Sequence, residues 1–163
     1  MFFRIITVIT AVFLCCPSFA DTGESFLGTV KKVIDGDSLL IAAKGITIEV
    51  RLYGLDAPEH NQPFADAAKQ FVKNWVNGDR VTVFPEYIDS YKRTVAVVEK
   101  GKQVLNRDLV KAGFAWVSPR YCHKDFCRKW MEMEERARYD RWGLWQDTSP
   151  VAPWIWKRAD RRY

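Results

Sequence analysis

The sequence contains few of the residues that most often bind zinc. It has two histidines and four cysteines among 163 residues, and two of the cysteines, Cys15 and Cys16, lie in an apolar stretch near the N-terminus. The other pair, Cys122 and Cys127, has only His123 beside it. Two cysteines and one histidine without a second cluster make a poor zinc signature. The sequence therefore disfavours a zinc site.

Long apolar runs are also scarce. The run from Ile5 to Cys16 is shorter than the roughly 20 residues that a membrane span needs. Arg4 precedes it, and small residues occupy the −3 and −1 positions of a cut after Ala20. This pattern predicts a signal peptide over residues 1–20 and a periplasmic or secreted mature protein without membrane contact. An uncleaved anchor is the alternative; a lipoprotein is disfavoured because no small residue precedes either cysteine of the run.

Internal repeats, low-complexity tracts and domain linkers are absent from the sequence, and its length is sufficient for one domain. We expect a single domain over residues 21–163, with a core at about residues 26–147 and a basic tail from Ile155 to Tyr163. The tail is expected to be a disordered, solvated terminus, with added phosphate contacts as the alternative. The formal net charge of +5 includes Arg4 of the leader. This modest surplus fits a polyanionic partner without requiring one.

The two cysteines of the mature chain are expected to be bridged. An exported chain enters an oxidising compartment, where a cysteine pair is more often bonded than free. We therefore predict a disulfide between Cys122 and Cys127, in preference to a metal site that includes His123. The enclosed loop is short, so the entropic stabilisation from this bridge should be small.

Strands are expected in the first half of the mature chain. Residues 46–53 alternate with period two, which is the clearest strand pattern in the sequence. The alternation places Glu49, Arg51 and Tyr53 on one face and the apolar residues between them on the other. Further strands are predicted at residues 26–34, 38–43, 80–84 and 94–99.

Helices are expected between and after these strands. Pro63 and the helical spacing of the apolar residues behind it predict a helix to about Val76. A short helix is predicted near residues 104–112 and a third, densely charged helix at residues 128–140. Five strands with one helix after the third strand and two after the fifth predict an α+β fold. We expect a five-stranded β-barrel of the oligonucleotide-binding (OB) type with three α-helices.

Five charged residues could together support phosphodiester hydrolysis. Asp37 and Asp56 lie on tight turns and could share a hard cation such as Ca²⁺, which accepts carboxylate, carbonyl and water oxygens. Glu59 could take a proton from the attacking water. Arg51 and Arg93 could hold phosphate oxygens and stabilise the charge of a five-coordinate transition state.

Each of these elements is ordinary by itself, because Asp-Gly-Asp is typical of a hairpin turn and a strand arginine is usually solvated. Their joint order is specific, and it resembles the staphylococcal (micrococcal) nuclease family, the thermonucleases. The resemblance extends from about Gly28 to Trp145. It includes the turn Ile-Asp-Gly-Asp-Ser at residues 34–38, Arg-Leu-Tyr-Gly-Leu-Asp-Ala-Pro-Glu at residues 51–59, Tyr-Lys-Arg at residues 91–93 and the segment from Val104 to Gly113.

The resemblance implies a role for each matching residue. Family members hydrolyse both DNA and RNA with Ca²⁺ and leave 3′-phosphate ends, so the expected partners are DNA and RNA, single-stranded or locally melted, and the protein is expected to be a monomer. The implied roles are Ca²⁺ binding for Asp37, Asp56 and the backbone carbonyl of Ala57, catalysis for Arg51, Arg93 and the general base Glu59, and substrate contact for Tyr91 and Tyr121.

The sequence departs from the family pattern at several positions. Ala57 stands where the staphylococcal enzyme has threonine, Lys92 replaces a glycine before Arg93, and Pro119 replaces a tyrosine of the base site. The stretch between Glu59 and the first helix is also shorter than the family's active-site loop. This difference bears on the position of Glu59 and on substrate access.

Two other functions compete with the nuclease. A barrel of this type can bind single strands by charge and stacking alone, as catalytically dead repeats of the family do without the acidic and arginine set. A structural Ca²⁺-binding domain is the other alternative, and it leaves the two arginines unexplained. The chain keeps the complete set of five charged residues, so the nuclease is the preferred hypothesis.

Overall fold

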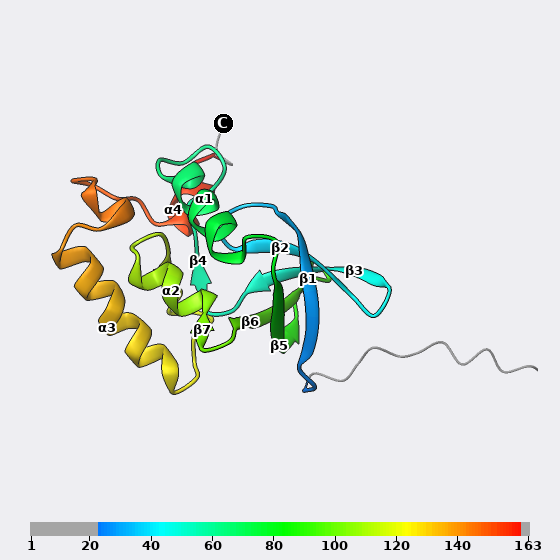
Figure 1. Ribbon diagram of the computed structural model, residues 1–163. Coiled ribbons are helices and arrows are strands. Elements are labelled where there is room, and N and C mark those ends of the chain that lie inside the picture. Colours follow the sequence, from blue (N-terminus) through cyan, green and yellow to red (C-terminus); the bar gives the residue numbers. More distant parts are fainter. Residues whose placement is uncertain (1–22, 161–163) are drawn as a thin grey trace, which may run out of the picture.

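The computed structural model describes residues 23–160, and the predicted signal peptide lies outside them. Five strands form a closed barrel in the order β3-β2-β1-β5-β6, in which β6 returns to pair with β3 (Figure 1). The β3–β6 pair is parallel, and the others are antiparallel. This topology confirms the expected OB-type barrel. Its strands are β1 (Phe26–Val33), β2 (Ser38–Ala43), β3 (Ile46–Leu52), β5 (Arg80–Ile88) and β6 (Thr94–Lys100).

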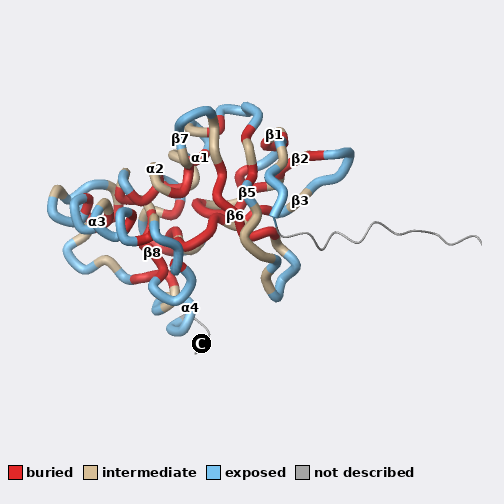
Figure 2. The backbone as a smooth tube through the Cα atoms, turned by 90° about the horizontal axis from the view of Figure 1, so that it is seen from below, coloured by how far each residue is buried: buried red, intermediate tan, exposed pale blue. Residues whose placement is uncertain are grey.

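The alternation predicted for the third strand is confirmed. Val50 and Leu52 are buried in the barrel core, whereas Glu49 is exposed and Arg51 is half-buried. Figure 2 shows burial along the tube, with buried residues in the barrel strands and exposed residues at the turn between β2 and β3. Tyr53, just after the strand, is buried as well.

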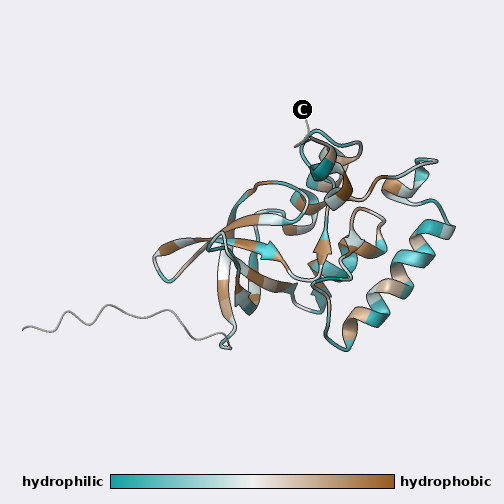
Figure 3. Ribbon diagram, turned by 180° about the vertical axis from the view of Figure 1, so that it is seen from behind, coloured by the Kyte–Doolittle hydropathy of each residue, from teal (hydrophilic) through white to brown (hydrophobic). Residues whose placement is uncertain are grey.

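The three predicted helices are present as α1 (Ala65–Val76), α2 (Leu105–Lys111) and α3 (Phe126–Tyr139). In α3, residues spaced three and four apart are buried, namely Cys127, Trp130, Glu134 and Ala137. Hydrophilic and hydrophobic residues accordingly share this helix along its length (Figure 3). No helix within residues 23–160 has the length and hydropathy that a bilayer crossing requires.

The expectation of three helices was incomplete, and the expectation of a disordered tail from Ile155 is wrong for residues 155–160, which belong to a helix that begins at Pro153. This fourth helix, α4 (Pro153–Asp160), is preceded by a 3-10 helix at Gly143–Gln146. Ala152 and Trp154 pack with Trp116, Leu144 and Trp145 in a second apolar cluster, separate from the barrel core. This burial orders a segment whose basic residues alone suggested a solvated terminus.

A small second sheet joins the end of the barrel to the helices. In this sheet β4 (Leu55–Asp56) pairs with β8 (Trp116–Val117). The short strand β7 (Gln103–Val104) instead pairs antiparallel with the end of β6 in the barrel sheet. The β1–β2 turn needs glycine at position 36, because a β-carbon there would lie 2.6 Å from the β-carbon of Ala57, the residue that follows β4. The close approach brings the β1–β2 turn against the end of β4.

Candidate active site

The β1–β2 turn directs Asp37 into the protein. The side chain of Asp37 is 3% exposed, and its Oδ2 atom accepts a hydrogen bond of 2.7 Å from the backbone N–H of Ala57. Its Oδ1 atom accepts a bond of 3.1 Å from the hydroxyl of Ser38. Within the turn, Oδ1 of Asp35 accepts a bond of 3.0 Å from the N–H of Asp37. The carboxylate of Asp37 therefore links the turn to the end of β4.

Arg51 lies beside Asp37 because it pairs with Ser38 in the β2–β3 ladder. One terminal nitrogen of the guanidinium donates to Oδ1 of Asp37, and the other donates to Oδ1 of Asp56. The second nitrogen also donates to the carbonyl of Leu55 at 3.3 Å. The two carboxylates that were predicted to bind a cation thus converge on one predicted catalytic arginine.

Burial dominates the titration of this group. It raises the pKa of the Asp37 carboxyl to about 7, and the charge of Arg51 opposes the rise only in part. Burial lowers the pKa of Arg51, but the negative charges of Asp37 and Asp56 raise it by a larger amount. The pKa of Arg51 therefore lies above its ordinary value. Arg51 therefore stays charged at neutral pH, whereas Asp37 exchanges a proton near neutrality.

Glu59 lies in the loop that leads from β4 to α1. Its side chain is 26% exposed, and its Oε1 atom is 2.8 Å from Nζ of Lys157 in α4. The backbone N–H of Glu59 donates a bond of 3.0 Å to Oε1 of Gln62. The predicted general base is thus open to solvent, three residues from Asp56, and paired with an ammonium group from the C-terminal helix.

Asp89 organises the turn between β5 and β6 that carries Arg93. Its Oδ1 accepts bonds of 2.9 Å from the backbone N–H groups of Tyr91 and Arg93, and its Oδ2 accepts one of 2.8 Å from Nε of Arg93. Burial raises the pKa of Asp89, but the bonds from the backbone and side chain of Arg93 outweigh it, and the pKa falls below its ordinary value. Arg93 is therefore a charged, oriented group.

The surroundings of Arg93 fit contact with a ligand from solvent. Its guanidinium carbon lies 5.4 Å from the ring centroid of Tyr91, which is 75% exposed. The following residue, Thr94, pairs with Val50, which places the turn beside the strand that carries Arg51. Lys92 has a φ of 63°, a left-handed conformation that residues with a β-carbon adopt at a cost. This backbone explains why the family pattern has glycine at this position.

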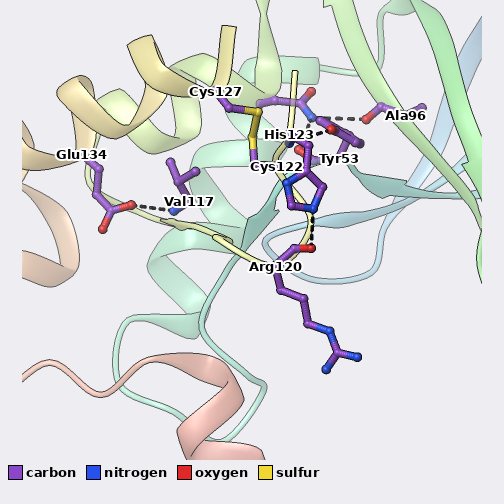
Figure 4. Close-up of a disulfide and its surroundings, with 9 residues drawn as sticks. Tyr53, Ala96, Val117, Arg120, Cys122, His123, Cys127 and Glu134 are labelled. Carbon is purple, nitrogen blue, oxygen red and sulfur yellow. Dashed lines mark hydrogen bonds between the residues drawn. A yellow bond between two sulfur atoms is a disulfide. The ribbon is translucent and has the colours of Figure 1, made fainter. Parts of the chain in front are cut away.

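The predicted disulfide between Cys122 and Cys127 is present, with their Cα atoms 5.7 Å apart (Figure 4). It packs on the turn after β3, because a β-carbon on Gly54 would lie 2.5 Å from Sγ of Cys122. The hydroxyl of Tyr53 accepts a bond of 3.1 Å from the N–H of His123. The bridged segment is thereby fastened to the end of the strand that carries Arg51.

Tyr121, the second predicted substrate contact, precedes the disulfide. It is 48% exposed, and the guanidinium carbon of Arg120 lies 5.4 Å from its ring centroid. Tyr91 and Tyr121 therefore share one feature, an exposed ring beside an arginine.

Residues 49–147 match a family model described as staphylococcal nuclease homologue. The matched region contains Arg51, Asp56, Glu59 and Arg93 and is more than half of the chain. The chain belongs to the staphylococcal nuclease family.

Individual members of the family resemble most of this chain. An "Uncharacterized endonuclease" of Haemophilus influenzae is 36% identical over 133 residues, covering 81% of this chain and 73% of the relative. "Micrococcal nuclease" of Shigella flexneri is 32% identical over 167 residues, covering 97% of this chain and 93% of the relative. "Protein ParB" of Escherichia coli is 31% identical over 140 residues, covering 80% and 78%. The named nucleases among them support nuclease activity as the general class of function.

The residues of this staphylococcal nuclease homologue fit calcium better than zinc. Within residues 23–160, no cluster of three or more His, Cys, Asp or Glu side chains forms a metal site. Asp37 and Asp56 approach one another closely enough to share a guanidinium. Two carboxylates supplemented by a main-chain carbonyl and water form an oxygen set of the kind that Ca²⁺ accepts. The donor chemistry therefore suits a hard cation.

Several residues that shape the site were missed from the sequence. Asp89, which orients Arg93, lies two residues before the Tyr-Lys-Arg segment at residues 91–93, so its position offered a signal. Asn106 is buried and donates from Nδ2 to the carbonyls of Tyr53 and Ala96 at 3.1 and 3.2 Å. Gln62 contacts Glu59 from three residues away. Lys157 contacts it from the C-terminal helix, and no local sequence pattern marks this second contact.

Proposed function

We propose that this protein is an exported, Ca²⁺-dependent phosphodiesterase that hydrolyses DNA and RNA at the P–O5′ bond and leaves 3′-phosphate ends. The observation that carries the proposal is the convergence of Asp37 and Asp56 on Arg51, with Glu59 three residues further along the same loop. A binding module needs no such concentration of buried charge. Removing charged groups from water is costly, and sites that retain them commonly serve a specific chemistry.

The cation site would be formed by Asp37, Asp56 and the backbone carbonyl of Ala57. A bound Ca²⁺ ion supplies positive charge at the scissile phosphate. Arg51 donates hydrogen bonds from beside this site, and its raised pKa keeps it charged throughout the working pH range. Because Arg51 pairs with both carboxylates here, binding of a cation and a phosphate involves a rearrangement of the guanidinium contacts.

Glu59 accepts the proton of the attacking water, whose oxygen forms the new bond to phosphorus. The P–O5′ bond breaks, and the leaving O5′ takes up a proton to become a 5′-hydroxyl, which leaves the phosphate on the 3′ side. Arg93 approaches from the β5–β6 turn and stabilises the negative charge that builds on the phosphate oxygens. Asp89 fixes the direction of Arg93 through the 2.8 Å bond to its Nε.

Tyr91 and Tyr121 are proposed as the substrate contacts. Both rings are exposed and lie beside arginines, an arrangement that suits bases and phosphates of an unpaired strand. This arrangement supports a preference for single-stranded or locally melted substrate.

The decisive experiment is cleavage of denatured DNA by the purified mature chain, first with Ca²⁺ and then with EGTA. We expect degradation with Ca²⁺, none with EGTA, and 3′-phosphate ends on the products. Glu59→Gln should lower turnover by orders of magnitude while leaving the circular dichroism spectrum unchanged. Salt-sensitive DNA binding without cleavage under either condition would replace the proposal with a binding module.

A further inference from the structure

Residues 59–62, the loop that contains Glu59, are held by the opposite end of the chain. Three side-chain contacts join this loop to residues 151–157, which we call the C-terminal clamp. In Figure 1, α4 at the red end of the colour range lies beside the loop that precedes α1. The contacts are Gln62 Nε2 to the carbonyl of Val151 at 2.5 Å, Trp156 Nε1 to Oδ1 of Asn61 at 2.9 Å, and Lys157 Nζ to Oε1 of Glu59 at 2.8 Å.

Gln62 is the central residue of this connection. It is 7% exposed, and its amide uses both ends: Oε1 accepts from the N–H of Glu59, and Nε2 donates to Val151. The backbone N–H of Gln62 returns a bond of 2.8 Å to the carbonyl of Glu59. A buried amide bonded in this way ties the backbone of Glu59 to the position of Val151.

The loop at residues 59–62 and the C-terminal clamp do not pack tightly against each other, so the polar contacts between them contribute more to holding the loop in place. A cavity of about 120 Å³ lies between them, lined by Gln62, Phe64, Trp116, Val151 and Trp156 among others. Hydrogen bonds therefore carry a larger share of the fixation of this loop than in the barrel core.

We propose that the C-terminal clamp positions Glu59 for proton transfer, with Gln62 as the main positioning residue. The inference rests on the proposed function, because it presupposes that Glu59 is the general base. A general base has to lie within hydrogen-bond reach of the proton that it accepts, and a misplacement of about 1 Å costs on the order of 100-fold in rate. Gln62 fixes the backbone of Glu59, and Lys157 restricts its carboxylate by holding Oε1.

The first test removes the two hydrogen-bonding links separately in the full chain. Gln62→Met keeps the length of the side chain and removes both of its bonds. We expect kcat to fall about 10- to 100-fold with KM unchanged. Trp156→Phe removes one N–H and should lower kcat about 3- to 10-fold. Trp75→Phe is the matched control, since it also removes one indole N–H bond, to Asp108 and outside the clamp, and its kcat should equal that of the wild type.

The second test concerns Lys157. Lys157→Met should lower kcat, and Lys157→Arg should restore it, because arginine keeps a cation on the carboxylate of Glu59. A higher kcat in Lys157→Met would mean that the ammonium group restrains the base, and it would overturn the role of Lys157. Lys129→Met, an exposed lysine of α3, is the control for loss of one positive charge.

The third test asks whether the clamp acts through Glu59. In a Glu59→Gln background, neither Gln62→Met nor Trp156→Phe should lower the residual rate further, and full additive losses would contradict the inference. Independently of activity, hydrogen exchange at the Glu59 amide should accelerate in Gln62→Met and Trp156→Phe but not in Trp75→Phe.

The outcomes separate the two proposals. Wild-type cleavage by Glu59→Gln would refute the general base itself. Impaired Glu59→Gln together with wild-type kcat in Gln62→Met, Trp156→Phe and Lys157→Met would refute the clamp alone.

Discussion

The buried and the exposed halves of the candidate site are held in place by different means. Asp37 lies in the turn between β1 and β2, and Arg51 lies on β3; their side chains are 3% and 14% exposed. The pairing register of β2 and β3 sets their positions. The side chains of Glu59 and Arg93 are 26% and 25% exposed, and side-chain contacts hold both residues in place. Gln62 and Lys157 contact Glu59, and Asp89 contacts Arg93. The barrel therefore provides a rigid charged group, and the loops bring the two exposed groups that are proposed to act on the substrate.

The largest expected effect contrasts the two arginines. Arg51→Ala and Arg93→Ala should each lower kcat at least 100-fold, because each removes a donor for the transition-state charge. Only Arg51→Ala should also destabilise the fold, by about 3 kcal/mol at pH 8, since it leaves the buried Asp37 carboxylate without its partner. Urea denaturation of the two variants measures this difference. Equal stability of both would show that the buried half is not held more firmly than the exposed half.

Calcium binding should respond to pH through the buried half. The pKa of Asp37 is raised by burial to about 7, so below this pH the carboxyl holds a proton that Ca²⁺ has to displace. We expect the apparent Kd for Ca²⁺ to rise about tenfold per pH unit below pH 7 and to level off above pH 8. Isothermal titration calorimetry at several pH values measures the slope. Asp37→Asn should abolish tight binding throughout, and a pH-independent Kd in the wild type would contradict the assignment.

The same pKa fixes the sign of the stability change without Ca²⁺. The folded pKa of Asp37 lies above the ordinary carboxyl value of 3.8, so the folded state binds more protons than the unfolded state between about pH 4 and pH 7. This contribution to stability is fully present below about pH 4 and is lost as pH rises through about 7. The effect of pH on thermal unfolding should diminish in Asp37→Asn, which has no proton to release.

Residues of both halves were named from the sequence, but only the positions of the buried half follow from local sequence patterns. Alternation at residues 46–53 placed Arg51 opposite the core residues Val50 and Leu52, and the Asp-Gly-Asp turn placed Asp37 at the strand end. Both are local signals, because a period of two or a turn tripeptide is complete within a few residues. The five strands and the three main helices follow from signals of the same kind.

The exposed half also depends on contacts between residues far apart in the sequence, which local patterns do not encode. Gln62 contacts Val151 across a sequence separation of 89 residues. The two-residue strands β4 and β8 are too short to produce an alternation, yet their pairing places Asp56. The basic residues of the C-terminal segment indicated disorder, whereas the burial of Ala152 and the packing of Trp154 decided its conformation. Tertiary packing overrode composition here.

Loss of the disulfide should affect stability more than chemistry. The bridge spans a sequence separation of 5 residues, so the chain-entropy estimate for its contribution is about 2 kcal/mol, at the lower end of the usual range. The double variant Cys122→Ala/Cys127→Ala should unfold at correspondingly lower urea concentration and keep its kcat. A large loss of kcat would show that the bridged segment, fastened to Tyr53, also sets the geometry of the buried half.

The smallest expected effect concerns the backbone of the exposed half. Lys92 has a φ of 63°, which costs a residue with a β-carbon roughly 1 kcal/mol or slightly more, whereas glycine adopts it freely but loses more entropy on folding. Lys92→Gly should therefore stabilise the protein by about 0.5 kcal/mol. Lys92→Ala keeps the β-carbon and removes the charge, so it should give no gain. Equal stabilisation by both variants in urea denaturation would assign the effect to the lysine charge instead of the backbone, and the turn would then be relaxed in its native conformation.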